Sequence, residues 1–500
     1  MKGRLGFAVA ALAAVAVLAF FYFDGATVKE SALQSRYYPL ADGGSFDLQA
    51  GVVRASVAGR NFNAYAFNGQ LPGPVLKVRQ GSRATLNFLN GLPEETSIHW
   101  HGLRVGNAFD GVPALTQNPV LPGEGFSYEL DFPDPGMYWY HPHLQEARQQ
   151  ELGLYGVILV EPEKEDYYGK ASREEVLVLD DILLDNGAPT FIEGVTTHAL
   201  MGRFGNVLLV NGGTGYELPA KTGEVIRFYA LNAANTRVFN FKIPGARLKV
   251  VGTDVSSFES EYFADSVVIA PSERYVIEAF FEKPGEHALV HETPYGEYSL
   301  GRVIVSSENQ AATESPSSSF LELKENKYVA AEVGPLKALF GKPVDVDWRL
   351  SVELQGHMGH AMSMGLGEDG IEWEDAMGSM NANLTTDSVK WVIQDRATGK
   401  ENDELQYNFK KGDHVKVRIF NDPKSMHPMQ HPIHFHGNRF LVLERDGVEN
   451  ENKAWKDTVL VPSGSAITLF LELSNPGKWM AHCHVSEHLE AGMMAQYGVA

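Results

Sequence analysis

The sequence is short of three features that define other kinds of protein. Cysteine occurs once in 500 residues, as Cys483, so no disulfide can form within the chain. Basic residues are outnumbered, 42 Lys and Arg against 63 Asp and Glu, and the formal charge of −21 gives a surface that repels phosphate backbones. No long stretch has the apolar spacing of an amphipathic helix. We therefore expect no nucleic-acid partner, whereas cationic metals and neutral organic molecules are compatible with this surface.

The N-terminus is typical of an export signal. Lys2 and Arg4 precede an apolar run from Leu5 to Phe23, without a twin arginine. The run exceeds the usual apolar length of about 7 to 15 residues, and residues 24–26 are not a clear cleavage motif, so an uncleaved anchor stays open. We expect residues 1–24 to be a signal peptide or an N-terminal membrane anchor. The body would then be extracytoplasmic: periplasmic, secreted or anchored to the outer face of the membrane.

Two patterns each occur three times along the chain. The first is a turn glycine, an alternating strand and a closing asparagine, at residues 81–90, 223–232 and 412–421. The second is a Pro-Gly pair followed by an apolar strand, at residues 135–143, 284–292 and 476–484. Short β-branched and aromatic strands separated by Gly and Pro turns run through all three units. The pattern predicts an all-β protein made of Greek-key β-sandwiches.

The boundaries follow from composition. The charged run at 161–166 separates the first two units, and the Ser-rich segment at 306–319 has linker composition. We expect domains at 36–162, 173–305 and 326–500, with a linker at 306–325.

The richest stretch is His482-Cys483-His484, followed by His488 and Met493. In an extended strand Cys483 points to one face, and the two flanking histidines point to the other, so one strand can serve two metal sites. A Cys, a His five residues later and a Met ten residues later form most of the His₂Cys set with axial Met of a blue copper site. One histidine of that set is still missing.

Four His-x-His pairs point to a second site. Residues two apart in a strand share a face, so each pair can present two imidazoles together. Aligned on Pro-Gly, the first and third units carry histidines where the middle unit has Val290 and Glu292. Imidazoles suit Cu, Zn, Fe or Ni, and the added Cys-His-Met set selects copper. The pairs are His99/His101, His141/His143, His434/His436 and His482/His484.

On these motifs the chain resembles the three-domain multicopper oxidases, the class of laccases and bacterial copper-efflux oxidases, over essentially all of its length after the leader. The resemblance implies three consecutive cupredoxin-like domains, a copper-free middle domain and four copper ions per chain. Type 1 copper would be bound by His431, Cys483 and His488 with Met493 axial, and type 2 copper by His99 and His434. The type 3 pair would be bound by His101, His141, His143, His436, His482 and His484. Glu487 and Asp110 match family positions that look like proton donors; each could instead be a solvated acid or a turn residue.

The resemblance implies four one-electron oxidations of a donor coupled to reduction of dioxygen to two waters. A phenolic or aromatic donor, as in laccases, is the default. Cu(I) is the alternative donor, because thioether and imidazole ligands favour it. The chain has His427 and Met429 just before His431, and Met358, Met362 and Met364 in a second methionine-rich stretch. A copper-free structural envelope protein of the same fold is a remote third possibility, against which the retained ligands argue.

Overall fold

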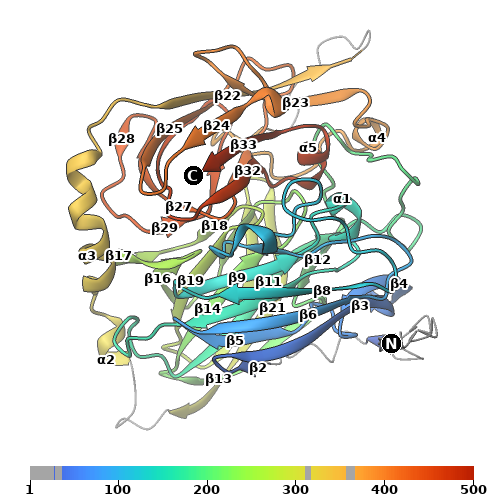
Figure 1. Ribbon diagram of the computed structural model, residues 1–500. Coiled ribbons are helices and arrows are strands. Elements are labelled where there is room, and N and C mark those ends of the chain that lie inside the picture. The colour runs from blue at the N-terminus through green and yellow to red at the C-terminus, as the bar shows by residue number, and fades with distance from the viewer. Residues whose placement is uncertain (1–26, 29–36, 310–316, 356–365) are drawn as a thin grey trace, which may run out of the picture.

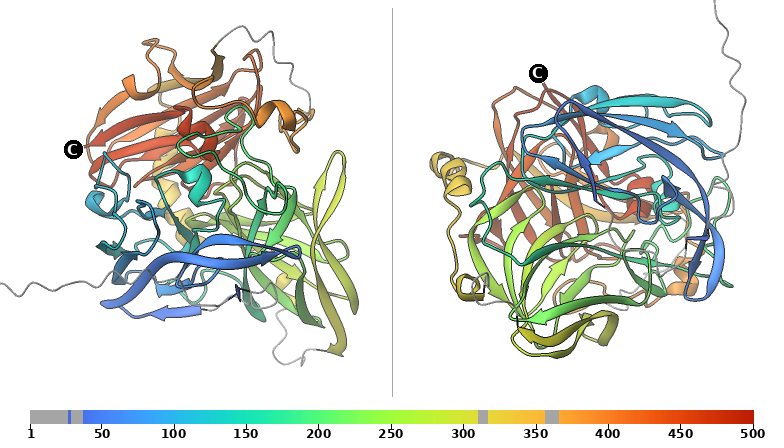
Figure 2. Two further views of the ribbon diagram at one scale, coloured as in Figure 1. Left: turned by 90° about the vertical axis from the view of Figure 1, so that its right-hand side faces the viewer. Right: turned by 90° about the horizontal axis from the view of Figure 1, so that it is seen from below.

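The computed structural model describes residues 27–28, 37–309, 317–355 and 366–500. Three of our expectations lie outside these residues: the leader at 1–24, the middle of the linker at 310–316, and the methionines Met358, Met362 and Met364. The chain runs from a blue first domain through a green-to-yellow second domain to an orange-to-red third domain (Figures 1 and 2). Among the described residues, no helix is long and apolar enough to cross a membrane.

The first domain consists of two sheets. One contains β1 (Thr27–Val28), β3 (Gly44–Val57), β4 (Arg60–Phe67), β6 (Arg83–Asn90) and β8 (Gly125–Asp131). The other has the order β2 (Tyr37–Leu40), β5 (Val75–Arg79), β10 (Gly156–Glu161), β9 (Gly136–His141) and β7 (His99–His101).

The second domain repeats this plan. One sheet has the order β12 (Val207–Val210), β11 (Arg173–Ile182), β14 (Val225–Asn232), β19 (Arg274–Phe280), β16 (Arg247–Thr253) and β17 (Ser256–Ala264). The other has the order β13 (Tyr216–Thr222), β21 (Gly296–Asn309), β20 (Gly285–Thr293), β15 (Phe239–Lys242) and β18 (Val267–Ile269).

The third domain repeats the plan again. One sheet contains β23 (Val389–Asp395), β22 (Val346–Leu354), β25 (His414–Asn421), β31 (Ala466–Glu472), β27 (Arg439–Arg445), β28 (Val448–Glu449) and β29 (Trp455–Lys456). The other has the order β24 (Gln406–Phe409), β33 (Met494–Val499), β32 (Gly477–Cys483), β26 (His431–Phe435) and β30 (Thr458–Val461). Buried side chains from both sheets form one core, so the predicted all-β fold of three sandwiches is confirmed.

Helices are short throughout the described chain, as the lack of helical periodicity predicts. The α-helices are α1 (Glu146–Gln149), α2 (Ser317–Phe320), α3 (Lys327–Val333), α4 (Gly378–Asn381) and α5 (Ser486–Glu490). The 3₁₀ turns are η2 (Asn107–Phe109), η3 (Gly334–Leu339) and η4 (Asn402–Glu404).

The threefold repeat seen in the sequence is a repeat of the structure. Strands β6, β14 and β25 each lie between a parallel and an antiparallel neighbour. The asparagine that closes each strand is buried, and its side-chain amide donates to two backbone carbonyls from later segments of the same domain. These are Glu94 and Val120 for Asn90, Arg237 and Ile269 for Asn232, and Met429 and Val461 for Asn421. One polar residue therefore closes the equivalent loop in every domain.

The segment between the second and third domains packs back across the first. The side chain of Asn326 caps α3 by accepting from the backbone amides of Tyr328 and Val329. Val329 and Val333 on α3 are buried in a core cluster that the first domain shares with third-domain side chains, among them Leu441 and Phe470. The connection thus helps to hold the third domain against the first, where the histidines of both meet.

Candidate metal centre

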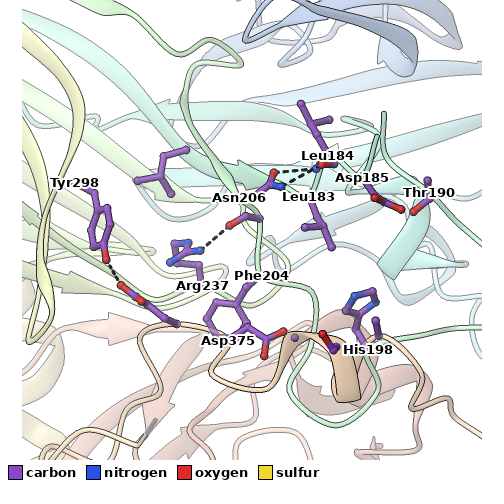
Figure 3. Close-up of a pocket in the computed structure, with 16 residues that line it drawn as sticks. Leu183, Leu184, Asp185, Thr190, His198, Phe204, Asn206, Arg237, Tyr298 and Asp375 are labelled. Atoms are coloured by element: carbon purple, nitrogen blue, oxygen red, sulfur yellow. Dashed lines mark hydrogen bonds between the residues drawn. The ribbon is translucent and has the colours of Figure 1, made fainter. Parts of the chain in front are cut away.

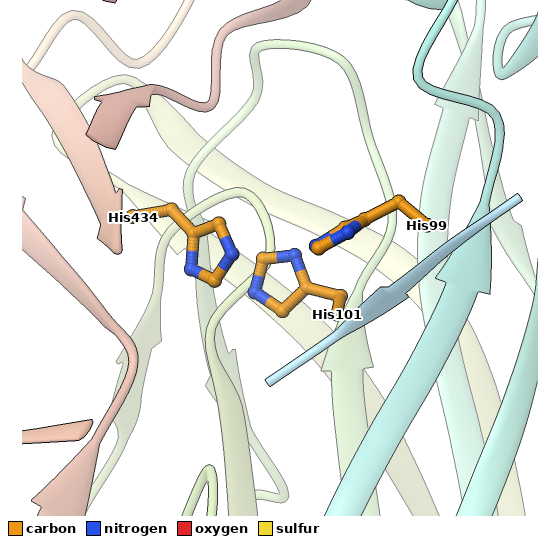
Figure 4. A group of neighbouring side chains, drawn as sticks. All are labelled: His99, His101 and His434. Atoms are coloured by element: carbon orange, nitrogen blue, oxygen red, sulfur yellow. The ribbon is translucent and has the colours of Figure 1, made fainter. Parts of the chain in front are cut away.

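Eight buried histidines from the first and third domains gather at one place. The rings of His101 and His434 stack with centroids 3.7 Å apart (Figure 4). The ring centroids of His99 and His436 lie 4.0 Å apart. These contacts join residues more than three hundred positions apart in sequence. The interdomain cluster expected from the four pairs is thus assembled by the fold.

Only one of the four His-x-His pairs lies wholly on a strand. His99 and His101 both lie on β7, but β9 ends at His141, β26 at Phe435 and β32 at Cys483. The second member of the other pairs therefore lies just past a strand end. There the chain leaves the sheet, and the two rings of a pair can point to different places.

The histidine nitrogens form three sets in which one ligand atom per residue lies within 4.8 Å of the others. Neighbours in sequence are divided between sets, since His141 and His143 belong to different ones. Each set combines the first and third domains. The sets are His99/His101/His434, His101/His141/His484 and His143/His436/His482.

Hydrogen bonds fix which nitrogen is free. Nδ1 of His99, His141 and His434 donates to the backbone carbonyls of Asp110, Pro142 and Asp457, at 2.8, 2.8 and 2.9 Å. A carbonyl only accepts, so Nδ1 carries the proton and Nε2 keeps its lone pair. Nε2 of these three histidines is buried and has no hydrogen-bond partner. Buried lone pairs of this kind, converging on one space, are what a copper ion requires.

Burial favours the neutral form of three of the eight histidines. Burial, followed by the charges of neighbouring histidines, lowers the pKa of His141, His482 and His484 well below the usual value. Neutral imidazole is the metal-binding form.

A second cluster lies within the third domain. Sγ of Cys483 is 3.5 Å from Nδ1 of His431 and 3.7 Å from Nδ1 of His488, and the two nitrogens are 3.3 Å apart. Met493 is fully buried, and its backbone carbonyl accepts from the amide of Cys483. Burial raises the pKa of the Cys483 thiol. A thiolate at this position is therefore stable only when a soft cation takes the place of the proton. The indole of Trp391 packs against the ring of His488, with ring centroids 4.1 Å apart.

The end of β32 joins the two clusters. Cys483 lies in the third-domain cluster, whereas His482 and His484 lie among the eight histidines. Nδ1 of His482 also donates to the carbonyl of Cys483 at 2.8 Å. The two centres are therefore linked by a few covalent bonds and one hydrogen bond.

The two predicted carboxylates are both buried, and Asp110 contacts histidines of the cluster directly. Asp110 follows η2, and its carboxylate lies 3.0 Å from Nδ1 of His436 and 3.4 Å from Nδ1 of His99. Glu487 lies on α5, and Nδ2 of Asn235 from the second domain donates to it at 3.4 Å. Burial raises the pKa of Glu487 to about 7.

Two further carboxylates at the cluster were missed from sequence. Glu146 on α1 lies 3.6 Å from Nδ1 of His141 and 3.7 Å from Nε2 of His143. Asp457 lies 3.0 Å from Nε2 of His101. Glu146 could have been predicted, because it lies three residues after His143. No nearby motif in the sequence points to Asp457.

The candidate substrate-metal residues that the structure describes are both inside the protein. Met429 is fully buried in the third-domain core. Nε2 of His427 lies 3.6 Å from a carboxylate oxygen of Glu372, and both side chains are fully buried. The side-chain polar atoms of this pair have no hydrogen-bond partner in the described structure.

Comparison with known proteins agrees with this geometry. Multicopper oxidase family models match residues 50–165, 161–312 and 374–500. The multicopper oxidase MmcO of Mycobacterium tuberculosis is 26% identical over 475 residues, covering 88% of this chain and 84% of that protein. A laccase of Arthroderma benhamiae is 26% identical over 520 residues, covering 92% and 78%. A crystal structure of a multicopper oxidase from Pseudomonas thermotolerans is 26% identical, covers 93% of this chain and all of its own, and superimposes with a TM-score of 0.69.

The chain belongs to the multicopper oxidase family. It is an oxidoreductase with three cupredoxin-like domains, and its histidine clusters fit the copper that the family uses.

Proposed function

We propose that the chain is a laccase-like oxidase that oxidises phenolic or aromatic donors and reduces dioxygen to two waters. One copper would be held by His431, Cys483 and His488, with Met493 as a fourth ligand. Three more would be held by the eight histidines, with His99 and His434 as type 2 ligands and the other six as type 3 ligands. Bound copper supplies the one-electron chemistry. The observation that carries the proposal is that Cys483 lies in one cluster while its neighbours His482 and His484 lie in the other.

A cavity of ≈ 620 Å³ between the second and third domains is the proposed entry for the donor (Figure 3). Its wall includes His198, Phe204 and Asp375. The chain after His198 leads toward the type 1 cluster, because the carbonyl of Ala199 accepts from Nε1 of Trp391 at 2.8 Å. Trp391 in turn covers His488, so a donor in the cavity would be separated from a ligand ring by few intervening groups.

The cavity suits a phenol. Figure 3 shows Arg237, Tyr298 and Asp375 around it. The hydroxyl of Tyr298 donates to the carboxylate of Glu374, so the lining already accepts one phenolic hydroxyl. Arg237 is engaged with Asp181 at 2.6 Å and with the carbonyls of Gly205 and Trp373, and is not free to bind an anion. A neutral aromatic donor with a hydroxyl fits this lining.

Oxygen uptake by copper-loaded protein with a dimethoxyphenol tests the proposal. One dioxygen should be consumed per four phenols oxidised, without hydrogen peroxide. Cys483→Ser should abolish both the blue colour and the uptake. Hydrogen peroxide as the main product, or uptake that survives Cys483→Ser, would contradict the proposal.

A second candidate donor is Cu(I), and one observation favours it. His427 and Glu372 form a fully buried pair whose polar atoms lack partners, and His427 is four residues before His431. A buried imidazole and carboxylate without hydrogen bonds are costly unless a cation or another polar group joins them. Met429 lies two residues before His431, but in the packed core.

The two donors are distinguished by one pair of assays. His427→Gln and Glu372→Gln are each compared with the parent chain for oxidation of Cu(I) and of dimethoxyphenol. Selective loss of Cu(I) turnover would support a metallo-oxidase. If both variants keep both activities, the phenol oxidase proposal stands, and His427 and Glu372 have a structural role only.

Two further proposals concern protons and location. Asp110 and Glu487 would deliver protons to the proposed dioxygen site, since both are buried, Asp110 contacts His436, and Glu487 lies near enough to Glu146 for its charge to raise the pKa of that carboxyl. Asp110→Asn and Glu487→Gln should slow oxygen uptake while copper content stays the same; lost copper would instead mean that they position ligands. Extracytoplasmic location is proposed from the leader at 1–24 and is tested by fractionating cells that express the full chain.

A further inference from the structure

The middle domain supplies no histidine to the cluster, yet one of its arginines reaches it. Arg274 begins β19 and is fully buried. Its Nε donates to the carbonyl of Met137 in the first domain at 2.8 Å. Its two terminal nitrogens bind both carboxylate oxygens of Asp457 in the third domain, one at 2.6 Å. A single guanidinium therefore joins all three domains.

Asp457 passes this contact on to two ligand histidines. Its carboxylate accepts from Nε2 of His101 at 3.0 Å, and its backbone carbonyl accepts from Nδ1 of His434 at 2.9 Å. The hydroxyl of Thr458 lies 3.1 Å from the first nitrogen and 3.2 Å from the second. The two rings stack on each other, as Figure 4 shows.

The carboxylate makes His101 differ from the other ligands. Since an ionised carboxylate only accepts, Nε2 of His101 carries the proton, and Nδ1 is the buried nitrogen without a partner. In His99, His141 and His434 the order is the reverse, with Nδ1 held and Nε2 free. His101 therefore has to be held by a side chain that reaches the far edge of its ring.

We infer that Arg274 is a positioning residue for the trinuclear copper cluster, which it orders by holding the Asp457 carboxylate against His101. The inference rests on the proposed binding of copper by the eight histidines. The planar fork of the guanidinium fixes both oxygens of Asp457 at once, which an ammonium cannot do. Without the fork, Asp457 is free to turn, and the tautomer and tilt of His101 are no longer set.

Arg227 gives a matched control. It is also a buried arginine of the second domain, and its guanidinium binds Glu278 at 2.7 Å. No contact of Arg227 in the described structure involves a cluster histidine. Arg227→Lys and Arg274→Lys thus make the same chemical change in the same domain, but only Arg274 binds a carboxylate that contacts a cluster histidine.

The experiment measures copper per chain, the blue type 1 absorption, and the type 2 electron paramagnetic resonance signal. The parent chain is measured first; if it binds no copper at the histidine cluster, the proposed function fails before the inference is tested. Arg274→Lys should keep the blue absorption, because the type 1 ligands lie elsewhere. It should also bind cluster copper about 10–100-fold more weakly, with an altered type 2 signal. Arg227→Lys should keep the parent spectra.

A second variant tests the same contact in case Arg274→Lys does not fold. Asp457→Asn preserves shape and removes the charge that Arg274 holds, and it should reproduce the altered type 2 signal. Parent-like spectra and copper content in both Arg274→Lys and Asp457→Asn would overturn the inference. The same spectral change in Arg227→Lys would also overturn it, because the effect would then be one of stability alone.

Discussion

Replacing Asp134 by Asn removes a charge from the boundary between the first and third domains. The carboxylate binds Arg104 of the first domain at 2.7 and 2.8 Å and Arg439 of the third domain at 3.0 Å. The Asp134 side chain is 10% exposed, and that of Arg104 is 19% exposed. Breaking a buried ion pair by removing one partner costs about 3–5 kcal/mol, because the other charge is left uncompensated.

The contacts that the two arginines keep after the substitution decide where in this range of about 3–5 kcal/mol the cost falls. Arg439 keeps Glu472 at 2.8 Å and Glu332 at 3.1 Å. Arg104 keeps the hydroxyl of Ser474 at 2.9 Å, which carries no charge. The cost therefore falls mainly on Arg104, and we expect about 3 kcal/mol. At about 2.1 cal/mol/K per residue, this lowers the melting temperature by about 3 °C if the chain unfolds as one unit, and by about 10 °C if one domain unfolds alone.

Thermal unfolding of the copper-loaded protein, with Asp131→Asn as control, is the assay. Asp131 also pairs with an arginine, Arg83 at 2.7 Å, but their side chains are 55% and 82% exposed. Exposed pairs contribute less than about 1 kcal/mol, so Asp131→Asn should melt almost like the parent chain. Equal melting of the two variants would refute the argument from burial.

The effect also has a pH signature. Burial disfavours the charge on Asp134, but Arg439 and Arg104 more than offset this and lower its pKa. A carboxyl whose pKa is lower in the folded state stabilises the protein above the unfolded value of about 3.9. That stabilisation is lost as the pH falls through the folded pKa. The melting difference between parent and variant should be constant above about pH 5 and shrink below about pH 4; a constant difference into acid would contradict it.

Three more outcomes follow from the packing. Gly437 has φ +64°, and a Cβ there would lie 2.3 Å from the ring of Trp479, so Gly437→Ala should lower the melting temperature by several degrees. The control is Gly399→Ala, at φ +74° in open space, which should cost only about 1 kcal/mol. In urea unfolding, Met429→Ala should cost about 2–5 kcal/mol as a core cavity and Met429→Leu less than about 1.5; equal costs would mean that the site is not packed. Chelating the copper should lower the melting temperature, and restoring it should reverse the loss, because only the folded chain assembles the clusters.

The gathering of these histidines in clusters could be predicted from sequence because its signal is local. A His-x-His pair such as His482 and His484, placed around Cys483, is readable within three residues. Repetition of the Pro-Gly and closing-asparagine patterns likewise revealed three copies of one fold. Both rest on short-range periodicity, which the structure preserves.

The supporting residues could not be predicted in this way. Asp457 meets His101 across 356 positions, and Arg274 reaches Asp457 from a domain without any ligand. Only tertiary packing brings these groups together. Sequence reasoning also placed His143, His436 and His484 on strands, whereas each lies just past a strand end. The pairing of nitrogens into sets depends on that exit from the sheet, which periodicity does not encode.

The division of the histidines between domains has a consequence for the order of maturation. Each three-histidine set combines the first and third domains, so none is complete until the third domain has docked onto the first; one set needs the chain as far as His434, and the other two need it as far as His482 or His484. The cluster of His431, Cys483 and His488 needs only the last part of the chain. On the proposed copper assignment, a molecule whose domains fail to dock would become blue and remain unable to consume oxygen, so colour alone would not measure a finished enzyme.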